Sequence, residues 1–434
     1  MIFTFFGAIF LFFCILSSFL KLEKQFYVFI FSIPFNATVL FEIKTSENYL
    51  SVSPSLFLAI IILTRILTLK KIGFSKNSVI FPMLFLISIL ASGLYNIVFP
   101  IEIEKFNGLK QEFENITSNP NLTSLTQFFY LAFWIMFVFF INRNIFVDMN
   151  RVVVSSLYAA SFVGTWGIYQ FLAGYYSFQY PYWIFNNSQS SYLTGYLQRI
   201  GESNLPRVTS VSAEPSILSA YLLVSIIIAI MANIKHSKIS TIVQYYCITS
   251  SILSLLLSTS TTAYIGLVAV IFTISIYYIF ISKTLFNKII YIFIFLSSLI
   301  MVGYTYPAIE KYISGFTTDK AQSFSFVNRA KTIASAYKNY QDSPIFGVGI
   351  GSVTSYSIVL WLLASFGIIG SFTFIFYLGS FIFKKNQQLF ITSAIIIIVI
   401  VDVISGFSYN YAVFWLPFVL SSIFDARRLV KKGG

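Results

Sequence analysis

Residues 205–234 read LPRVTSVSAEPSILSAYLLVSIIIAIMANI. A polar stretch that holds Arg207 and Glu214 changes at Pro215 into an apolar run without charged residues. A run of this length can cross a hydrocarbon core of roughly 30 Å. Proline is favoured in the first turn of a helix, where its missing N–H is not needed. The stretch therefore predicts a membrane helix that begins at Pro215, with two charged residues beside its first turn.

Similar apolar runs recur along the whole chain. Of the 434 residues, 57% are hydrophobic and only 10% are charged, whereas a soluble domain carries about 25% charged residues. The first run, residues 1–20, lacks a basic segment and a signal-peptidase site, so we interpret it as a retained span. We expect an all-α, polytopic membrane protein of about 12–14 transmembrane helices. Residues 1–434 would form a single integral membrane domain.

The net charge of +13 is distributed unevenly. Basic clusters such as KHSK and the tail DARRLVKK fall in alternate short connections, which the positive-inside rule assigns to the cytoplasm together with the C-terminus. The charge therefore indicates topology and not a nucleic-acid partner. The long polar segments 102–124, 175–210 and 308–357 fall on the other side. We expect these to be the main periplasmic loops, two of them large and bearing short amphipathic helices.

The composition excludes several kinds of chemistry. Cys14 and Cys247 lie in apolar runs, and His236 is the single histidine, so cysteine-based metal sites and Ser-His-Asp catalysis are not indicated. The acidic pair in EIE, residues 102–104, is a weak metal-binding signal and is more typical of a solvated loop. We predict no metal site and no cofactor. Catalysis would rest on Arg, Lys, Glu, Asp, Tyr or backbone groups.

The opening stretch is the strongest candidate site. Pro215 at the first helical position places Glu214 at the helix cap, where backbone N–H groups and the positive end of the helix dipole favour an anion. Arg207 can reach the same region from the preceding loop. Glu214 could then accept a proton from a sugar hydroxyl. The alternative is an ordinary capping glutamate beside an interfacial arginine, and the local pattern leaves both open.

Residues 323–352, SFSFVNRAKTIASAYKNYQDSPIFGVGIGS, form a second candidate. Aromatic and aliphatic residues recur at helical spacing, which predicts a basic amphipathic helix on the membrane surface. That helix would present Arg329 and Lys331 to an anionic head group, or would be only a solvated anchor. The glycines of GVGIGS, residues 347–352, indicate close backbone approach to a ligand or a tight re-entry into the next span, because no nucleotide-binding strand–helix unit surrounds them.

Taken together, these stretches resemble the Wzy-type polymerases of the O-antigen polymerase/ligase superfamily. The resemblance covers roughly residues 200–375 and rests on four motifs in a fixed order. They are RVTSVSAEPSILSAYL (207–222), LSTSTTAYIGL (257–267), NRAKTIASAYKNYQDSPIFGVGIG (328–351) and LWLLASFGIIGSF (360–372).

Two departures from the family pattern matter. The frequent Ser-Arg pair reads Ser260-Thr261 here, and the histidine that ligases carry after the glycine-rich loop is absent, with Tyr356 and Ser357 in its vicinity. The second departure argues against a ligase mechanism that needs this histidine. An arginine followed by Glu-Pro-Ser is typical of the polymerases.

The resemblance implies an enzyme at the periplasmic face of the bacterial inner membrane. Its donor would be an undecaprenyl-diphosphate-linked glycan, and its acceptor another lipid-linked repeat unit. Glu214 would act as the catalytic base and Arg207 would stabilise the leaving diphosphate, with Arg329, Lys331 and Arg199 also binding the lipid diphosphate. The lipid bilayer and a chain-length regulator protein are further candidate partners, and no nucleotide sugar or nucleic acid is implied.

Two rival functions fit parts of the pattern. An O-antigen ligase of the same superfamily would transfer the glycan to lipid A core. A lipid-linked-oligosaccharide flippase would show internal pseudo-symmetry and polar groups along a central cavity, whereas ionisable residues within the spans are few here. A polymerase predicts that Arg207, Glu214 and Arg329 converge beneath the outer loops.

Overall fold

The structure is a computed structural model that describes residues 2–44, 49–69, 76–107, 112–141, 147–187, 199–200, 205–232, 238–281, 284–293, 295–297, 324–384, 388–406 and 409–433. Most of this chain is helical. The helices are α1 (Phe5–Ser18), α2 (Leu22–Ser32), α3 (Pro54–Leu67), α4 (Lys76–Val98), α5 (Leu122–Ile141), α6 (Met149–Tyr175), α7 (Tyr182–Phe185), α8 (Pro215–Met231), α9 (Lys238–Leu257), α10 (Thr261–Ile281), α12 (Phe324–Asp342), α13 (Ile358–Ile382), α14 (Leu389–Ser405) and α15 (Ala412–Gly433). The strands are β1 (Phe41–Lys44), β2 (Tyr49–Val52), β3 (Glu102–Asn107), β4 (Glu112–Thr117), β5 (Arg199–Ile200) and β6 (Leu205–Pro206).

The helices confirm the prediction of a polytopic membrane protein. Within the described residues, five helices are long and apolar enough to cross a membrane: α4, α5, α6, α10 and α13. Shorter apolar helices, among them α1, α3, α8 and α14, complete the bundle. The number of spans, about 12–14 by hydrophobic run length, stays a prediction, as do the sides on which the loops lie.

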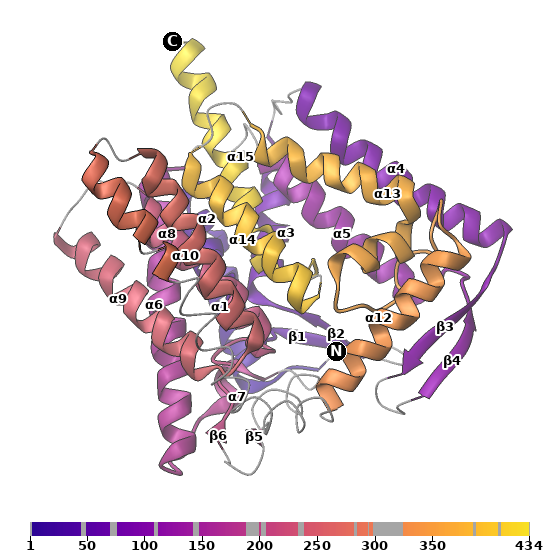
Figure 1. Cartoon of the computed structure of the whole chain (residues 1–434), viewed down its shortest axis with the longest axis horizontal. Helices are drawn as coiled ribbons and strands as arrows, with labels where there is room; N and C mark the ends of the chain where they lie inside the picture. Colours follow the sequence, from indigo (N-terminus) through magenta and orange to yellow (C-terminus); the bar gives the residue numbers. More distant parts are fainter. Residues whose placement is uncertain are drawn as a thin grey trace.

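Helix α8 is the central helix of the bundle. It is buried along nearly its whole length, against α6, α9, α10, α14 and α15 (Figure 1). A helix that is apolar all round is typical of the core of a large protein or of a membrane span. Its first residue is Pro215, as predicted, so Glu214 lies at the end of the central helix and not at the lipid-facing edge of the bundle.

Small residues allow α6 and α9 to pack closely. A Cβ atom added at Gly164 would lie 2.8 Å from the Ser250 hydroxyl, and one at Gly167 would clash with the Ser254 hydroxyl. Helices in membranes associate through such small-residue contacts, because lipid offers no hydrophobic driving force. The contact fixes α6, whose Gln170 holds the loop before α8.

Helix α13 is broken in its middle. Gly367 has φ 63° and ψ −166°, which interrupts the helical hydrogen bonds. The chain that precedes α13 supplies the missing partners: Ile368 N–H donates to Pro344 O at 2.8 Å, and Val348 N–H donates to Ala364 O at 2.8 Å. Unpaired backbone groups are expensive inside a membrane protein, so a broken helix requires a neighbouring segment that satisfies it.

The glycine-rich loop is that neighbouring segment. Gly347 has φ 70°, and a Cβ atom there would lie 2.5 Å from Phe366 N; a Cβ atom at Gly367 would overlap Ile345 O. Asn96 of α4 also donates to Gly347 O at 3.0 Å. Gly347 therefore permits close backbone approach to α13, and Gly351 permits close approach to the backbone of Ser124 on α5.

Three two-stranded antiparallel hairpins add to the helices that the sequence predicts. Hairpin β3–β4 forms within the predicted loop 102–124 and lies beside α12 (Figure 1). A small hydrophobic cluster joins this hairpin to α12, the glycine-rich loop and α13; its members are Ile103, Ala336, Val348, Val353 and Ala364. Residues 188–198 and 201–204 of the predicted loop 175–210, and residues 308–323 of the loop 308–357, lie outside the described residues.

The glycine at position 347 should be essential for folding. Gly347→Ala places a side chain in the left-handed region and against the backbone of α13, so we expect a loss of at least about 2 kcal/mol in the free energy of unfolding. Gly93→Ala on α4, where no atom lies within 4 Å of the added carbon, is the matched control. Monodisperse yield and Tm of the detergent-solubilised variants check this. Equal Tm for both variants would contradict the role of the loop.

Candidate functional site

The loop between β6 and α8 is held rigidly by buried hydrogen bonds. Gln170 of α6 accepts the backbone N–H of Thr209 at 2.9 Å and of Ser210 at 2.7 Å. The Ser210 hydroxyl donates to Val163 O at 2.7 Å, and its backbone has φ 54°. On the opposite side, Asn36 accepts the N–H of Ala213 at 2.8 Å. Both ends of the loop are therefore fixed on neighbouring elements.

Glu214 occupies the N-cap position of α8, as predicted. Its backbone is extended (φ −139°, ψ 153°), and its side chain makes no capping hydrogen bond to the helix. The carboxylate instead accepts the Ser216 hydroxyl at 3.1 Å, and the residue is exposed. Glu214 therefore lies at the cap position without capping the helix through its side chain, and its role as a catalytic base stays a prediction. The carboxylate faces the same region as Arg207.

Arg207 lies largely buried at the start of the loop. Burial lowers the pKa of its guanidinium, and the positive charge of Arg329 lowers it further, while Glu214 opposes both effects. An arginine remains charged in proteins despite such shifts. The structure thus brings together the three residues that the sequence analysis selected: two cations and one carboxylate within electrostatic range.

Two tyrosines complete the cluster. The guanidinium of Arg329, on α12, lies 5.0 Å from the ring centroid of Tyr356, in the connection between the glycine-rich loop and α13. Burial raises the pKa of the Tyr356 phenol; the negative charge of Glu214 adds to this, and Arg329 opposes it. Glu214 also interacts electrostatically with Tyr411, just before α15. Tyr356 therefore lies near both the cation and the carboxylate.

Two further predicted ligands are Lys331 and Arg199. Lys331 Nζ is 5.0 Å from the ring centroid of Phe106, which turns this lysine toward hairpin β3–β4. The side chain of Arg199, in β5, is outside the described residues. The role of both residues in lipid-diphosphate binding remains a prediction.

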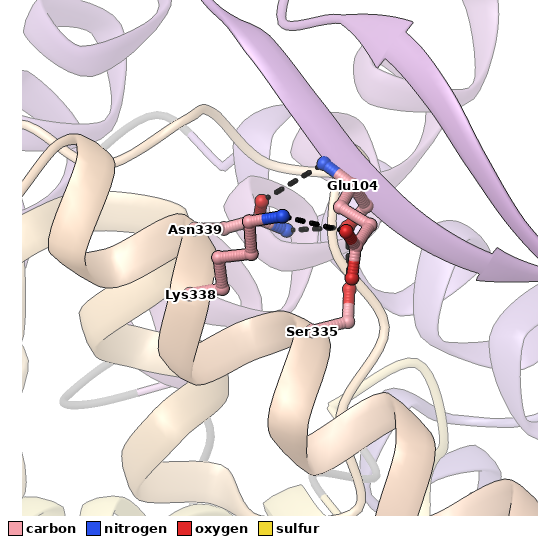
Figure 2. A network of polar contacts seen from close by, with 4 residues as sticks. All are labelled: Glu104, Ser335, Lys338 and Asn339. Carbon is pink, nitrogen blue, oxygen red and sulfur yellow. Dashed lines mark hydrogen bonds and ion pairs between the residues drawn. The ribbon is translucent and has the colours of Figure 1, made fainter.

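Glu104 of the hairpin makes a network of polar contacts with helix α12 (Figure 2). Its backbone N–H donates to Asn339 Oδ1 at 3.1 Å, and its backbone carbonyl accepts from Asn339 Nδ2 at 2.9 Å and from the Ser335 hydroxyl. Its carboxylate pairs with Lys338 Nζ at 2.6 Å. Of the acidic pair at 102–104, Glu104 therefore serves this contact. Among the described residues, no group of three metal-ligating side chains exists.

The buried face of α12 differs from the expectation. Ser335, Ala336 and Asn339 are buried, whereas Ala334 and Tyr337 are exposed. Helical spacing alone assigned the polar side chains away from any packing surface. They face protein because β3 offers them backbone hydrogen-bond partners.

The comparisons identify one family. Residues 246–362 match the family model Wzy_C, described as O-antigen ligase. The chain carries a Wzy_C domain. A comparison with curated proteins gives no match. Wzy_C enzymes are membrane enzymes that transfer glycans in the assembly of surface polysaccharides, as polymerases or ligases. The match spans about a quarter of this chain, which is a multi-pass membrane protein.

The Wzy_C domain contains only part of the site. Arg329 and Tyr356 lie within it, whereas Arg207 and Glu214 precede it. Sequence reasoning missed Gln170, because nothing local marks a buried glutamine as a loop anchor. The sequence indicates Tyr356 as a possible site residue because it follows the glycine-rich loop, where ligases carry a histidine. No comparable sequence feature indicates Tyr411.

The ring of Tyr356 should orient Arg329. Tyr356→Leu removes the ring, and a cation–π contact worth about 0.5–2 kcal/mol predicts a roughly 2–30-fold lower kcat/KM for glycan transfer. Tyr356→Phe keeps the ring and should stay close to the parent enzyme. Transfer from a lipid-linked donor by the purified variants measures both. An equal loss in the two variants would assign the role to the hydroxyl and not to the ring.

The Asn339 contact should matter for stability. Asn339→Leu removes the acceptor of the Glu104 backbone N–H and one of the two donors to the Glu104 backbone carbonyl. We expect this to lower the free energy of unfolding by about 1–3 kcal/mol. Gln341→Leu, an exposed change on the same helix, is the control. The Tm values and the rate of limited proteolysis within α12 measure the difference. If Asn339→Leu were as stable and protease-resistant as the control, the hairpin would not fasten α12.

Proposed function

We propose that the chain is a Wzy-type polymerase that extends a surface polysaccharide on its undecaprenyl-diphosphate carrier. The observation that carries this proposal is that Arg207 lies within electrostatic range of a second arginine, Arg329, and of the carboxylate of Glu214. Bringing two like charges together with partial burial is unfavourable unless an anion joins them. A diphosphate matches this excess of positive charge, and arginine is well suited to its oxygens.

The residues support a direct displacement. A hydroxyl of the acceptor unit attacks the anomeric carbon of the donor sugar, and a carbon–oxygen bond forms there. The bond between that carbon and the diphosphate oxygen breaks, and the lipid diphosphate leaves with the electron pair. Glu214 takes the proton of the attacking hydroxyl, while Arg207 and Arg329 stabilise the charge that develops on the leaving group. This route inverts the anomeric centre.

A ligase is the second candidate, because the description of the matched family model names one. Donor chemistry would be the same, and only the acceptor would differ. The vicinity of the glycine-rich loop holds Tyr356 and Ser357 where the ligases carry a histidine, which favours the polymerase. The two functions differ in product: a ladder of repeat lengths, or the transfer of preformed glycan to a lipid A core.

Complementation tests the proposal. The parent gene, expressed in a host that makes the matching repeat unit but lacks its own polymerase, should restore a ladder of surface glycan on a gel. Arg207→Ala, Glu214→Ala and Arg329→Ala should each collapse the ladder to single-unit product, because loss of one charge-stabilising group costs about 10²–10³ in rate.

Matched controls are Arg151→Ala on α6 and Glu112→Ala on β4, both exposed and remote from the cluster. They should keep the ladder at equal membrane levels. Single-unit product from the parent gene, with consumption of preformed lipid-linked glycan, would instead favour ligation. A full ladder in the three site variants would overturn the assignment of Arg207, Glu214 and Arg329.

A further inference from the structure

Two adjacent residues of α12 each hold a buried polar atom without a hydrogen-bond partner. They are Oδ1 of Asn328 and Nε of Arg329, and neither has a partner among the described residues. One atom accepts hydrogen bonds and the other donates them. Buried polar atoms are nearly always paired in folded proteins, so two such atoms side by side need an explanation.

The rest of the same helix shows how complete the pairing otherwise is. Asn339 lies three turns after Asn328, on the same side of α12. Its side-chain oxygen accepts a hydrogen bond from the backbone N–H of Glu104, and its side-chain nitrogen donates one to the backbone carbonyl of Glu104. Ser335, on that side too, bonds to the carbonyl of Glu104. The unpaired atoms therefore occur only where α12 reaches the cluster of Arg207, Glu214 and Tyr356.

The position of Arg329 is fixed by other contacts. Its guanidinium carbon lies 5.0 Å from the ring centroid of Tyr356, and its charge interacts with that of Arg207. The cation–π contact holds the guanidinium beside the ring. An unpaired donor held in this way beside a second arginine is suited to a phosphate oxygen.

The acceptor on Asn328 cannot pair with the same group. An ionised diphosphate offers only acceptor oxygens, so it bonds to Arg329 Nε and leaves Asn328 Oδ1 unsatisfied. Asn328 needs a donor: a hydroxyl or an amide N–H. In a sugar diphosphate, both kinds of group occur within one linkage, the phosphate oxygens on one side and the hydroxyl or acetamido group of the first sugar on the other.

We propose that Asn328 and Arg329 together recognise the junction between the diphosphate and the first sugar of the lipid-linked substrate. Arg329 Nε donates to a phosphate oxygen, and Asn328 Oδ1 accepts from the hydroxyl or amide group next to the anomeric carbon. This inference rests on the proposed function and adds a specificity-determining residue to it. Asn328 selects sugars that carry a donor at that position.

The decisive variant is Asn328→Leu. Leucine has nearly the same size and removes an unpaired buried acceptor, so the Tm should stay equal or rise. A residue with a merely structural role would lower the Tm. Asn115→Leu, at an exposed position of β4, is the matched control, and Arg329→Ala should weaken the binding of every diphosphate probe.

Binding to the full-length protein in detergent is measured with four synthetic probes. These are citronellyl phosphate, citronellyl diphosphate, citronellyl-diphosphate-N-acetylglucosamine and its 2-deoxy analogue. The parent protein should bind the acetamido probe about 5–10-fold more tightly than the 2-deoxy probe, as expected for one hydrogen bond. Asn328→Leu should bind these two probes equally and retain the parent preference for diphosphate over monophosphate.

The outcomes separate the two proposals. If the parent protein does not prefer citronellyl diphosphate to the monophosphate, the diphosphate site of the proposed function fails. If that preference holds but Asn328→Leu still discriminates between the acetamido and 2-deoxy probes, the role of Asn328 is overturned and the proposed function stands. A lower Tm with equal weakening of all probes would make Asn328 a structural residue, which also overturns the inference.

Discussion

The site depends on how the protein satisfies the backbone of a broken membrane helix. Helix α13 is interrupted at Gly367, and its freed groups pair with the segment of residues 344–349. That segment directly follows α12 and precedes Tyr356. Because its backbone must stay against α13, it fixes both the end of α12 and the start of α13. The positions of Arg329 and Tyr356 thus depend on the backbone hydrogen bonds between residues 344–349 and α13, in which neither residue takes part.

The sequence predicts the parts of the site that rest on local signals. Pro215 after Glu214 is enough to define the start of α8, since proline favours the first turn and an uninterrupted apolar run follows. The face of α12 could not be predicted in the same way. Asn339 is polar, and only the backbone of Glu104, more than two hundred residues earlier, makes its burial favourable. A hydrogen bond between residues so far apart in the sequence produces no periodic sequence pattern from which it could be predicted.

The electrostatics of the cluster distinguish it from a structural ion pair. A pair of one cation and one anion has its charge balanced internally, whereas the Arg207 guanidinium interacts with a second cation, Arg329, as well as with the carboxylate of Glu214. The residual positive charge is held by a loop that Gln170 makes rigid and by a helix that Glu104 fastens. The loop and the helix that carry the two guanidinium groups are thus each fixed by hydrogen bonds to neighbouring elements. The proposed stabilisation of a leaving group requires such preorganisation.

The two arginines belong to different packing units. The loop of Arg207 is anchored on α6, within the large hydrophobic core, whereas α12 packs on the small cluster that contains Ile103 and Ala336. The Wzy_C match covers α12 and, within the large core, only residues of α9, α10, the glycine-rich loop and the start of α13. The distance between the two guanidinium groups thus depends on how these units meet, and not on either unit alone. Hairpin β3–β4 belongs to neither the matched domain nor the central bundle, yet it sets the position of α12. A chain could carry the Wzy_C segment intact and still lose the geometry of the site through a change in this hairpin.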